Sequence, residues 1–223
     1  MPDPVYAWIA DLRASRAVED RPGLAHRLGE ALQHLGLVGG DAWLAPPRTV
    51  KGIDEISGLL RTPAPAFDAL VHLHLSLWPL QFRVGLGEGD VDVARRTGDA
   101  GAMDGSAFHR AAAALDRAGD QDLPFAIARA DDAPTAVTVA AEALAALHVT
   151  WTGRWTARQT AAALAYRDLG HQRDAARRLG VSQPAVSRHL RAAAHDELVR
   201  AEAALRGLLP RCFAAEPRRG ADA

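Results

Sequence analysis

The sequence predicts an α+β protein with a mixed N-terminal domain and an all-α C-terminal domain. Short apolar runs rich in β-branched residues alternate with helical patterns up to residue 132. After Pro134 no strand pattern occurs, and apolar residues recur at helical spacing instead. With 223 residues, of which 48% are hydrophobic, the chain is long enough to bury a core in each part. We therefore expect two packed domains, residues 1–132 and residues 133–223.

The first two expected elements are a strand and a helix. The run VYAWIADL has the apolar, β-branched content of a buried strand, and it ends at Asp11. Leucines recur at helical spacing from Pro22 to Leu37, and Gly36 or Gly39 is expected to end that helix.

A hairpin, a helix and a further strand follow. Two strand-like runs around Lys51–Asp54 predict the hairpin, and Pro46–Pro47 places its first strand at an edge of the sheet. The run FDALVHLHLSLW is long enough for a helix, with Pro79 as its stop. The run FRVGLGEG predicts a strand that passes into a glycine-rich turn at residues 85–89.

A third helix and a last strand complete the N-terminal domain. The run GSAFHRAAAALDRAG predicts a helix that is capped by Ser106, and PFAIARA predicts a short strand. The order strand, helix, strand, strand, helix, strand is that of a ferredoxin-like sheet with its helices on one face.

The C-terminal domain is expected to be helical throughout. Residues 135–150 form an apolar helical run, and Thr156 with Gln159 matches a capping box at the start of the next helix. Trp151 and Trp155 lie four residues apart, and we expect them to seal the junction between the two domains.

The stretch HQRDAARRLGVSQPAVSRHLRAAA, residues 171–194, predicts a helix-turn-helix motif. Gly180 allows a tight left-handed exit from the first helix, and Ser182 can cap the second. Pro184 is tolerated in the first turn, where no intrahelical N–H bond is lost. The residues expected to pack between the two helices are Ala175, Ala176, Leu179, Val186 and Leu190.

The outward residues of this motif suit double-stranded DNA. Gln and Arg side chains can read base edges in the major groove, and those of the first helix can contact the backbone that it crosses. The predicted DNA-contacting residues are Gln172, Arg173, Arg177, Ser182, Gln183, Pro184, Ser187, Arg188 and Arg191. There are two alternatives. One is an αα-hairpin whose arginines only keep a helical surface soluble in water. The other is a scaffold protein in which the same two helices bind another protein.

The distribution of charge favours the DNA interpretation. Residues 1–150 carry 13 Lys and Arg against 20 Asp and Glu, whereas residues 151–223 carry 13 against 7. A basic segment attracts polyphosphate and an acidic body repels it. The sequence therefore predicts a transcriptional regulator that reads the major groove with the helix at residues 183–194.

Other features bear on location and assembly. The N-terminus does not read as a signal peptide, no apolar run is long enough to span a membrane, and Cys212 is the single cysteine. We therefore expect a cytoplasmic protein. Residues 192–209 read as one continuing helix with an apolar stripe, which either pairs two copies in a homodimer or packs onto its own domain. The stripe residues are Leu198, Ala201, Leu205 and Leu208.

Four separated motifs resemble those of the SatD family, in the same order along the chain. They are Ala10–Arg16 (ADLRASR), Ile53–Leu59 (IDEISGL), Arg83–Gly89 (RVGLGEG) and Met103–His109 (MDGSAFH). The N-terminal half of that family is similar to class III nucleotidyl cyclase and diguanylate cyclase catalytic domains. The resemblance therefore implies a nucleotide ligand and Mg²⁺, with Asp11 and Asp54 as metal ligands and Glu55 beside them. Carboxylate oxygens are the ligands that Mg²⁺ prefers.

Two replacements in these motifs change the expectation about activity. Ala10 and Ile53 stand where the family motifs have glycine, and a β-branched residue blocks close approach of a phosphate to the backbone. The N-terminal domain is thus predicted to bind a nucleotide or metal, or to sense one, without turnover. The alternative is a Mg²⁺-dependent, cyclase-like enzyme that uses Asp11 and Asp54.

Overall fold

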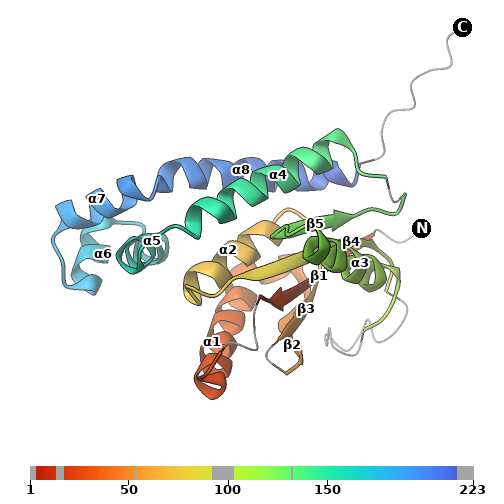
Figure 1. Ribbon diagram of the computed structural model, residues 1–223, viewed down its shortest axis with the longest axis horizontal. Coiled ribbons are helices and arrows are strands. Elements are labelled where there is room, and N and C mark those ends of the chain that lie inside the picture. Colours follow the sequence, from red (N-terminus) through yellow and green to blue (C-terminus); the bar gives the residue numbers. More distant parts are fainter. Residues whose placement is uncertain (1–3, 14–17, 53, 92–102, 132, 215–223) are drawn as a thin grey trace, which may run out of the picture.

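The computed structural model describes residues 4–13, 18–52, 54–91, 103–131 and 133–214. Strands and helices are mixed up to residue 128, and in the described part of the chain only helices follow (Figure 1). The α+β class is therefore confirmed. The elements of the first part are β1 (Val5–Leu12), α1 (Arg21–Gly39), β2 (Trp43–Lys51), β3 (Glu55–Leu60), α2 (Ala66–Ser76), β4 (Phe82–Gly89), α3 (Ser106–Asp120) and β5 (Phe125–Ala128). The helices of the second part are α4 (Ala136–Thr152), α5 (Ala157–Leu169), α6 (Gln172–Leu179), α7 (Gln183–Ala192) and α8 (His195–Cys212).

The strands form one five-stranded sheet in the order β2-β3-β1-β4-β5. Neighbouring strands are antiparallel except β4 and β5, which are parallel. The predicted hairpin is present as β2 and β3, and β2 is the edge strand that Pro46–Pro47 indicated. Its register is irregular around these prolines, because proline has no N–H to offer to the ladder.

The prediction that the helices lie on one face of the sheet is wrong. Alternate residues of β1 point to opposite faces. Trp8 and Leu12 belong to the core that contains α1 and α2. Ala7 and Ile9 belong to a second cluster, which contains Ala107 of α3. Helix α3 therefore covers the face opposite α1 and α2.

The glycines of β4 explain how α3 reaches that face. The predicted turn at residues 85–89 is wrong, because β4 continues to Gly89. A Cβ atom at Gly87 would lie 2.2 Å from the backbone nitrogen of Ala111, and one at Gly85 would lie 2.1 Å from its carbonyl oxygen. These glycines let the α3 backbone pack directly on the strand. Ser106 does not cap α3 as predicted, and its hydroxyl accepts a hydrogen bond from the backbone of Asp90 instead.

Helices α4 and α8 lie side by side along the sheet domain, and α6 and α7 lie at one end of them (Figure 1). The predicted continuous helix over residues 192–209 is wrong. The helix is interrupted at Ala193 and Ala194, between the end of α7 and the start of α8. Ala194 has a φ of 51°, in the left-handed region that is unfavourable for alanine. The capping box of α5 is confirmed, with reciprocal bonds between Thr156 and Gln159.

The second part shares a hydrophobic core with the first. One cluster of buried residues runs from the sheet and α2 through α4, α5 and α8 to α6 and α7. Leu198 and Leu205 of the predicted dimer stripe are buried in this cluster, so the stripe packs onto its own chain. The division at residue 132, between β5 and α4, stays a prediction. Within the described ranges, no helix is both long and apolar enough to cross a membrane.

Helices α4, α5 and α8, which we call the helical layer, meet at the buried carboxylate of Glu202. Its Oε1 atom lies 2.7 Å from His148 Nε2 of α4, and Arg167 of α5 donates to both oxygens at 2.6 and 2.9 Å. A second carboxylate ties the layer to the sheet. Glu142 accepts bonds from Arg117 of α3 at 2.6 and 3.1 Å and from the backbone of Ile127 at 2.8 Å.

We expect Glu202→Gln to destabilise the fold, because it leaves Arg167 without its counter-charge in a buried site. The free energy of unfolding in urea should fall by about 3 kcal/mol at pH 7. Burial alone raises the pKa of Glu202, but the bonds from His148 and Arg167 outweigh burial and hold it at about 2. Because the folded-state pKa is depressed, wild-type stability should be lost as pH falls from about 4.5 towards 2. The variant should lack this part of the pH dependence, and the exposed Glu197→Gln should behave as wild type.

Candidate functional site

The bihelical unit, residues 172–192, consists of α6, a tight turn and α7. Gly180 ends α6 in the left-handed conformation, with φ 64° and ψ 30°. The N–H of Val181 donates to the carbonyl of Ala176 at 3.0 Å, and that of Gly180 donates to Arg177 at 3.3 Å. This is the Schellman pattern. Ser182 then caps α7 by accepting a bond from the backbone N–H of Ala185 at 3.3 Å.

The two helices pack through the residues that the sequence predicted. Ala175 and Ala176 of α6 and Val186 and Leu190 of α7 are buried in the main cluster, and Leu179 packs against it at partial burial. The small alanines let the two helices approach closely. The inner face of the unit is therefore closed, and only its outer face can meet a ligand.

The outer face of α7 carries polar and positively charged side chains. Gln183, Pro184, Arg188 and Arg191 are exposed, and Ser187 is half-buried. In the described part of the chain, neither Arg188 nor Arg191 has an ion-pair partner. Both guanidinium groups are thus available to an external anion or base.

The predicted residues of α6 border a hollow beside this face. The hollow has a volume of about 690 Å³ and lies between the end of α5 and the starts of α6 and α7. Gln172, Arg173, Arg177 and Gln183 line it. Arg173 has no ion-pair partner among the described residues, whereas Arg177 pairs with Asp174 on its own helix.

Two tryptophans hold the end of α7. Trp151 Nε1 and Trp155 Nε1 both donate to the carbonyl of Ala193, at 3.2 and 3.0 Å. These two side chains join α4 and the segment before α5 to the end of α7, and Trp155 is also buried in the core shared with the sheet. Their predicted place at a junction between two domains stays a prediction. The sequence offered no signal for a carbonyl that lies about forty residues away.

The acidic site, Asp11, Asp54 and Glu55, lies where β1 ends beside the β2–β3 hairpin. Asp11 is the register partner of Glu55 on β3 and of Arg83 on β4. The N–H of Leu12 donates to the carbonyl of Asp54 at 3.0 Å, so the backbone of Asp54 lies beside the end of β1. The role of these residues as metal ligands stays a prediction. Burial raises the pKa of Asp11, Arg83 opposes this effect, and the charges of Asp54 and Glu55 add to it.

The acidic site is not a complete metal cage. In the described ranges, no three His, Cys, Asp or Glu side chains are arranged to hold a metal ion. Asp54 Oδ1 is shielded from solvent and lies 3.6 Å from Arg21 Nη2, beyond hydrogen-bonding distance. Mg²⁺ commonly uses only one or two carboxylates together with substrate phosphates, so a carboxylate pair fits such a role. Ile53, which was expected to block phosphate approach, lies outside the described residues.

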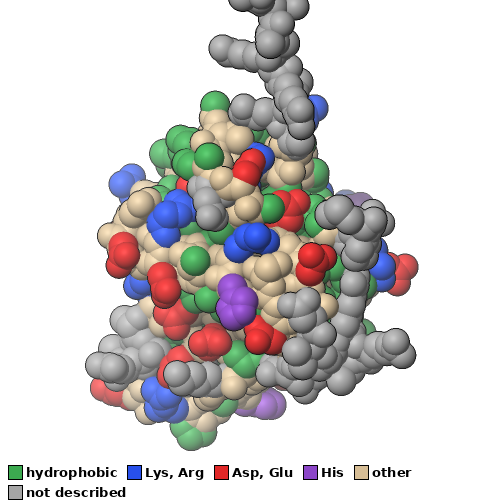
Figure 2. All heavy atoms as spheres, turned by 90° about the vertical axis from the view of Figure 1, so that its right-hand side faces the viewer, with side chains coloured by type: hydrophobic (Ala, Val, Ile, Leu, Met, Phe, Trp, Pro, Cys, Tyr) green, Lys and Arg blue, Asp and Glu red, His purple; other side chains and the backbone are tan. Residues whose placement is uncertain are grey.

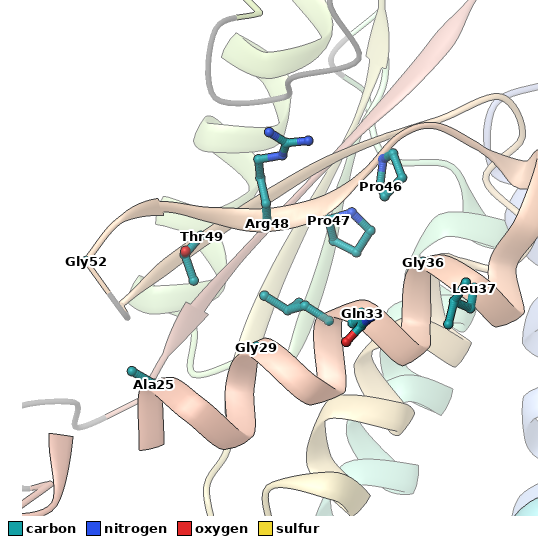
Figure 3. A pocket seen from close by; sticks show the side chains of 11 residues that line it. Ala25, Gly29, Gln33, Gly36, Leu37, Pro46, Pro47, Arg48, Thr49 and Gly52 are labelled. Atoms are coloured by element: carbon teal, nitrogen blue, oxygen red, sulfur yellow. The ribbon is translucent and has the colours of Figure 1, made fainter. Parts of the chain in front are cut away.

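An open groove between α1 and β2 runs up to this site (Figure 3). Its volume is about 780 Å³, and Ala25 and Gly52 border the end next to Asp54. Figure 3 shows Gln33 on α1, Pro47 opposite it on β2, and Arg48 pointing away from the helix. This groove was not predicted from the sequence. Its signal is the series of small residues along one face of α1, namely Ala25, Gly29 and Gly36.

The two candidate sites differ in their electrostatic surroundings. Figure 2 looks at the end of the molecule away from the bihelical unit, and acidic side chains spread over much of its described surface. The bihelical unit itself carries five arginines and one aspartate, which is Asp174. The bihelical unit is therefore the more basic of the two surroundings.

These features define an α+β protein whose sheet carries an acidic strand-end site and whose helical layer carries a basic bihelical unit. The SatD family model matches residues 5–209, so the chain belongs to the SatD family. Membership was predicted from four short motifs and is confirmed over most of the chain. No curated protein sequence matches this chain at a significant level.

We expect Asp11→Asn to stabilise the protein at pH 7, because the amide avoids placing a third negative charge beside Asp54 and Glu55. A raised folded-state pKa means that ionised Asp11 costs stability above its unfolded pKa of about 3.9. The gain should be below about 1 kcal/mol because Asp11 is partly solvated. The thermal midpoint should rise by about 1–3 °C at pH 7 and converge with wild type near pH 3. Asp116→Asn, on the exposed side of α3, should leave the midpoint unchanged.

Proposed function

We propose that this protein binds double-stranded DNA through the bihelical unit and regulates transcription. The observation that carries the proposal is the outer face of α7, where Arg188 and Arg191 are exposed and have no ion-pair partner among the described residues. Arginine can form two hydrogen bonds with the O6 and N7 atoms of guanine in the major groove. Gln183 at the start of α7 has the chemistry to read adenine. In this proposal α7 is the recognition helix of a helix-turn-helix motif.

Helix α6 is proposed to lie across the DNA backbone. In helix-turn-helix proteins the first helix crosses the backbone while the N-terminal residues of the second contact base edges. The hollow lined by Arg173, Arg177 and Gln172 can receive a phosphate group, with Gln183 at its border. Ser182 and Pro184 shape the start of α7, and Ser187 is placed to contact a phosphate or a base edge.

Replacing Arg188 and Arg191 together by alanine tests the DNA proposal. The probe is a DNA sequence that wild-type protein selects from a random library, and binding is measured by gel shift at fixed salt. Each arginine is expected to contribute about 1–3 kcal/mol, so the affinity of the double variant should fall about thirtyfold or more.

A matched control is the double variant Arg200→Ala/Arg211→Ala. It removes the same charge from exposed positions on α8, outside the bihelical unit. Its affinity should fall only slightly, through the weaker general attraction to DNA. Equal losses in both variants, or no selection of any sequence by wild type, would contradict the proposed recognition by α7.

We further propose that the sheet domain binds a nucleotide with Mg²⁺ as a sensing module without turnover. The order β1-α1-β2-β3-α2-β4 with β2-β3-β1-β4 adjacent supports a ferredoxin-like core, extended by α3 and β5. The convergence of Asp11 and Asp54 beside an open groove favours this second role. Arg21, 3.6 Å from Asp54, is near enough to meet a phosphate at the same place. A cyclase-like enzyme using Asp11 and Asp54 is the competing form of this proposal.

Thermal unfolding with each of the four nucleoside triphosphates and Mg²⁺ or Mn²⁺ tests the second proposal. A ligand at 100 times its Kd stabilises by about 2.7 kcal/mol, so one nucleotide should raise the midpoint of wild type clearly. Asp11→Asn/Asp54→Asn should lose this ligand-induced shift, and Asp116→Asn should keep it. Chromatography of the mixtures should show no new product. A product that both aspartates are needed for would establish the enzyme instead, and no shift with any nucleotide would exclude both forms.

A further inference from the structure

Helix α4 exposes a face that has no charge. Its two ionisable side chains, Glu142 and His148, are both buried. The exposed residues, which we call the outer face of α4, are Ala136, Val139, Ala140, Ala143, Leu147, Thr150 and Trp151. A helix that is apolar on all sides is normally covered on all sides. The sheet and α8 cover only one side of α4, so its outer face is suited to contact another molecule.

The outer face of α4 combines a projection with a depression. At the C-terminal half, Leu147 and Trp151 are 69% and 48% exposed. At the N-terminal half, Val139 and Ala143 border a hollow of about 610 Å³ between α3 and α4. Ala113, Ala114 and Leu123 add apolar surface to this hollow. The projection and the hollow therefore lie on the same helix, one on each side of its midpoint.

The charges at this surface also fit an antiparallel arrangement. Arg117 in the wall of the hollow pairs with Glu142, and Arg129 pairs with Asp131. Because these charges are paired within one copy, an apolar side chain that enters the hollow meets no unpaired charge from them. Two antiparallel copies of α4 also have helix dipoles that oppose favourably.

We propose that this face binds a second copy of the same chain, with α4 packed antiparallel against α4 of the other copy. The two-fold axis then passes between Ala143 and Leu147. Leu147 and Trp151 of each copy enter the α3–α4 hollow of the other. In such an isologous contact one patch meets itself, which requires a face that is complementary to itself in shape and charge.

A second copy fits this face better than it fits the other exposed elements. The apolar stripe of α8 is already buried in its own chain. A stable dimer needs about 800 Å² of buried surface on each partner. Helix α4 has 17 residues and is about 25 Å long, and the α3 residues that line the hollow widen its outer face at the N-terminal half. The proposed contact therefore uses the length of α4 and the α3 side of the hollow.

The dimer has a consequence for DNA recognition, which rests on the proposed function. The same two-fold axis relates the two α7 helices, and Trp151 links the outer face of α4 to the carbonyl that follows α7. The DNA sites of such a dimer are expected to be inverted repeats. The dimer itself does not depend on DNA and can be tested without it.

Analytical ultracentrifugation of the full chain, without DNA, tests the dimer. Wild type should show a concentration-dependent monomer–dimer equilibrium in the micromolar range. Leu147→Glu places a charge at the centre of the proposed contact and should be monomeric at concentrations where wild type is dimeric. Its circular dichroism should stay that of wild type, since the side chain is largely exposed. Val199→Glu adds the same charge at an exposed position on α8 and should remain dimeric.

Chemical cross-linking gives a second and independent test. Ala143→Cys lies beside the proposed axis, and a short bis-maleimide should join two copies of this variant efficiently. Ala203→Cys, exposed on α8, should not be joined. The native Cys212 is buried and serves as an internal background. A wild type that is monomeric at every concentration overturns the proposal, as does a dimer that survives Leu147→Glu or cross-links only through residue 203.

Discussion

The arrangement of the helical layer depends on one buried carboxylate, that of Glu202. It joins α8 to His148 of α4 and to Arg167 of α5, and α5 in turn packs against α6 and α7. Removing a charge from water is costly unless its partners are close and well oriented, so this contact permits only a narrow range of helix positions. The placement of the bihelical unit relative to the sheet therefore depends on a buried side chain in the helical layer.

Glu142 extends the same constraint to the sheet. Because it binds Arg117 of α3 and the backbone of β5, α4 cannot shift without losing buried hydrogen bonds. A ligand at Asp11 could then influence α7 in two ways. It could favour another packing of the whole layer on the sheet, or it could change how two copies associate through α4. An isolated movement of α7 is opposed by the two indole groups that bind Ala193.

Local chemistry made some of this structure predictable from sequence. The Gly180 turn and the Thr156–Gln159 capping box are determined by neighbouring residues, and Asp11 lies opposite Glu55 because strand register pairs them. The position of α3 was not predictable in the same way. Gly85 and Gly87 read equally well as turn residues, and only the packed helix shows that they make room for its backbone. The Glu202 contacts join positions 35 and 54 residues away, and no local pattern marks them.

The two edges of the sheet limit how this protein can associate at all. An exposed edge strand offers free N–H and C=O groups, through which chains can add strand to strand without end. Here β2 places Pro46 and Pro47 at one edge, and β5 at the other is only four residues long. Open-ended growth through the backbone is thereby discouraged at both sides. Association is left to side chains on helices, where a contact can be closed and finite.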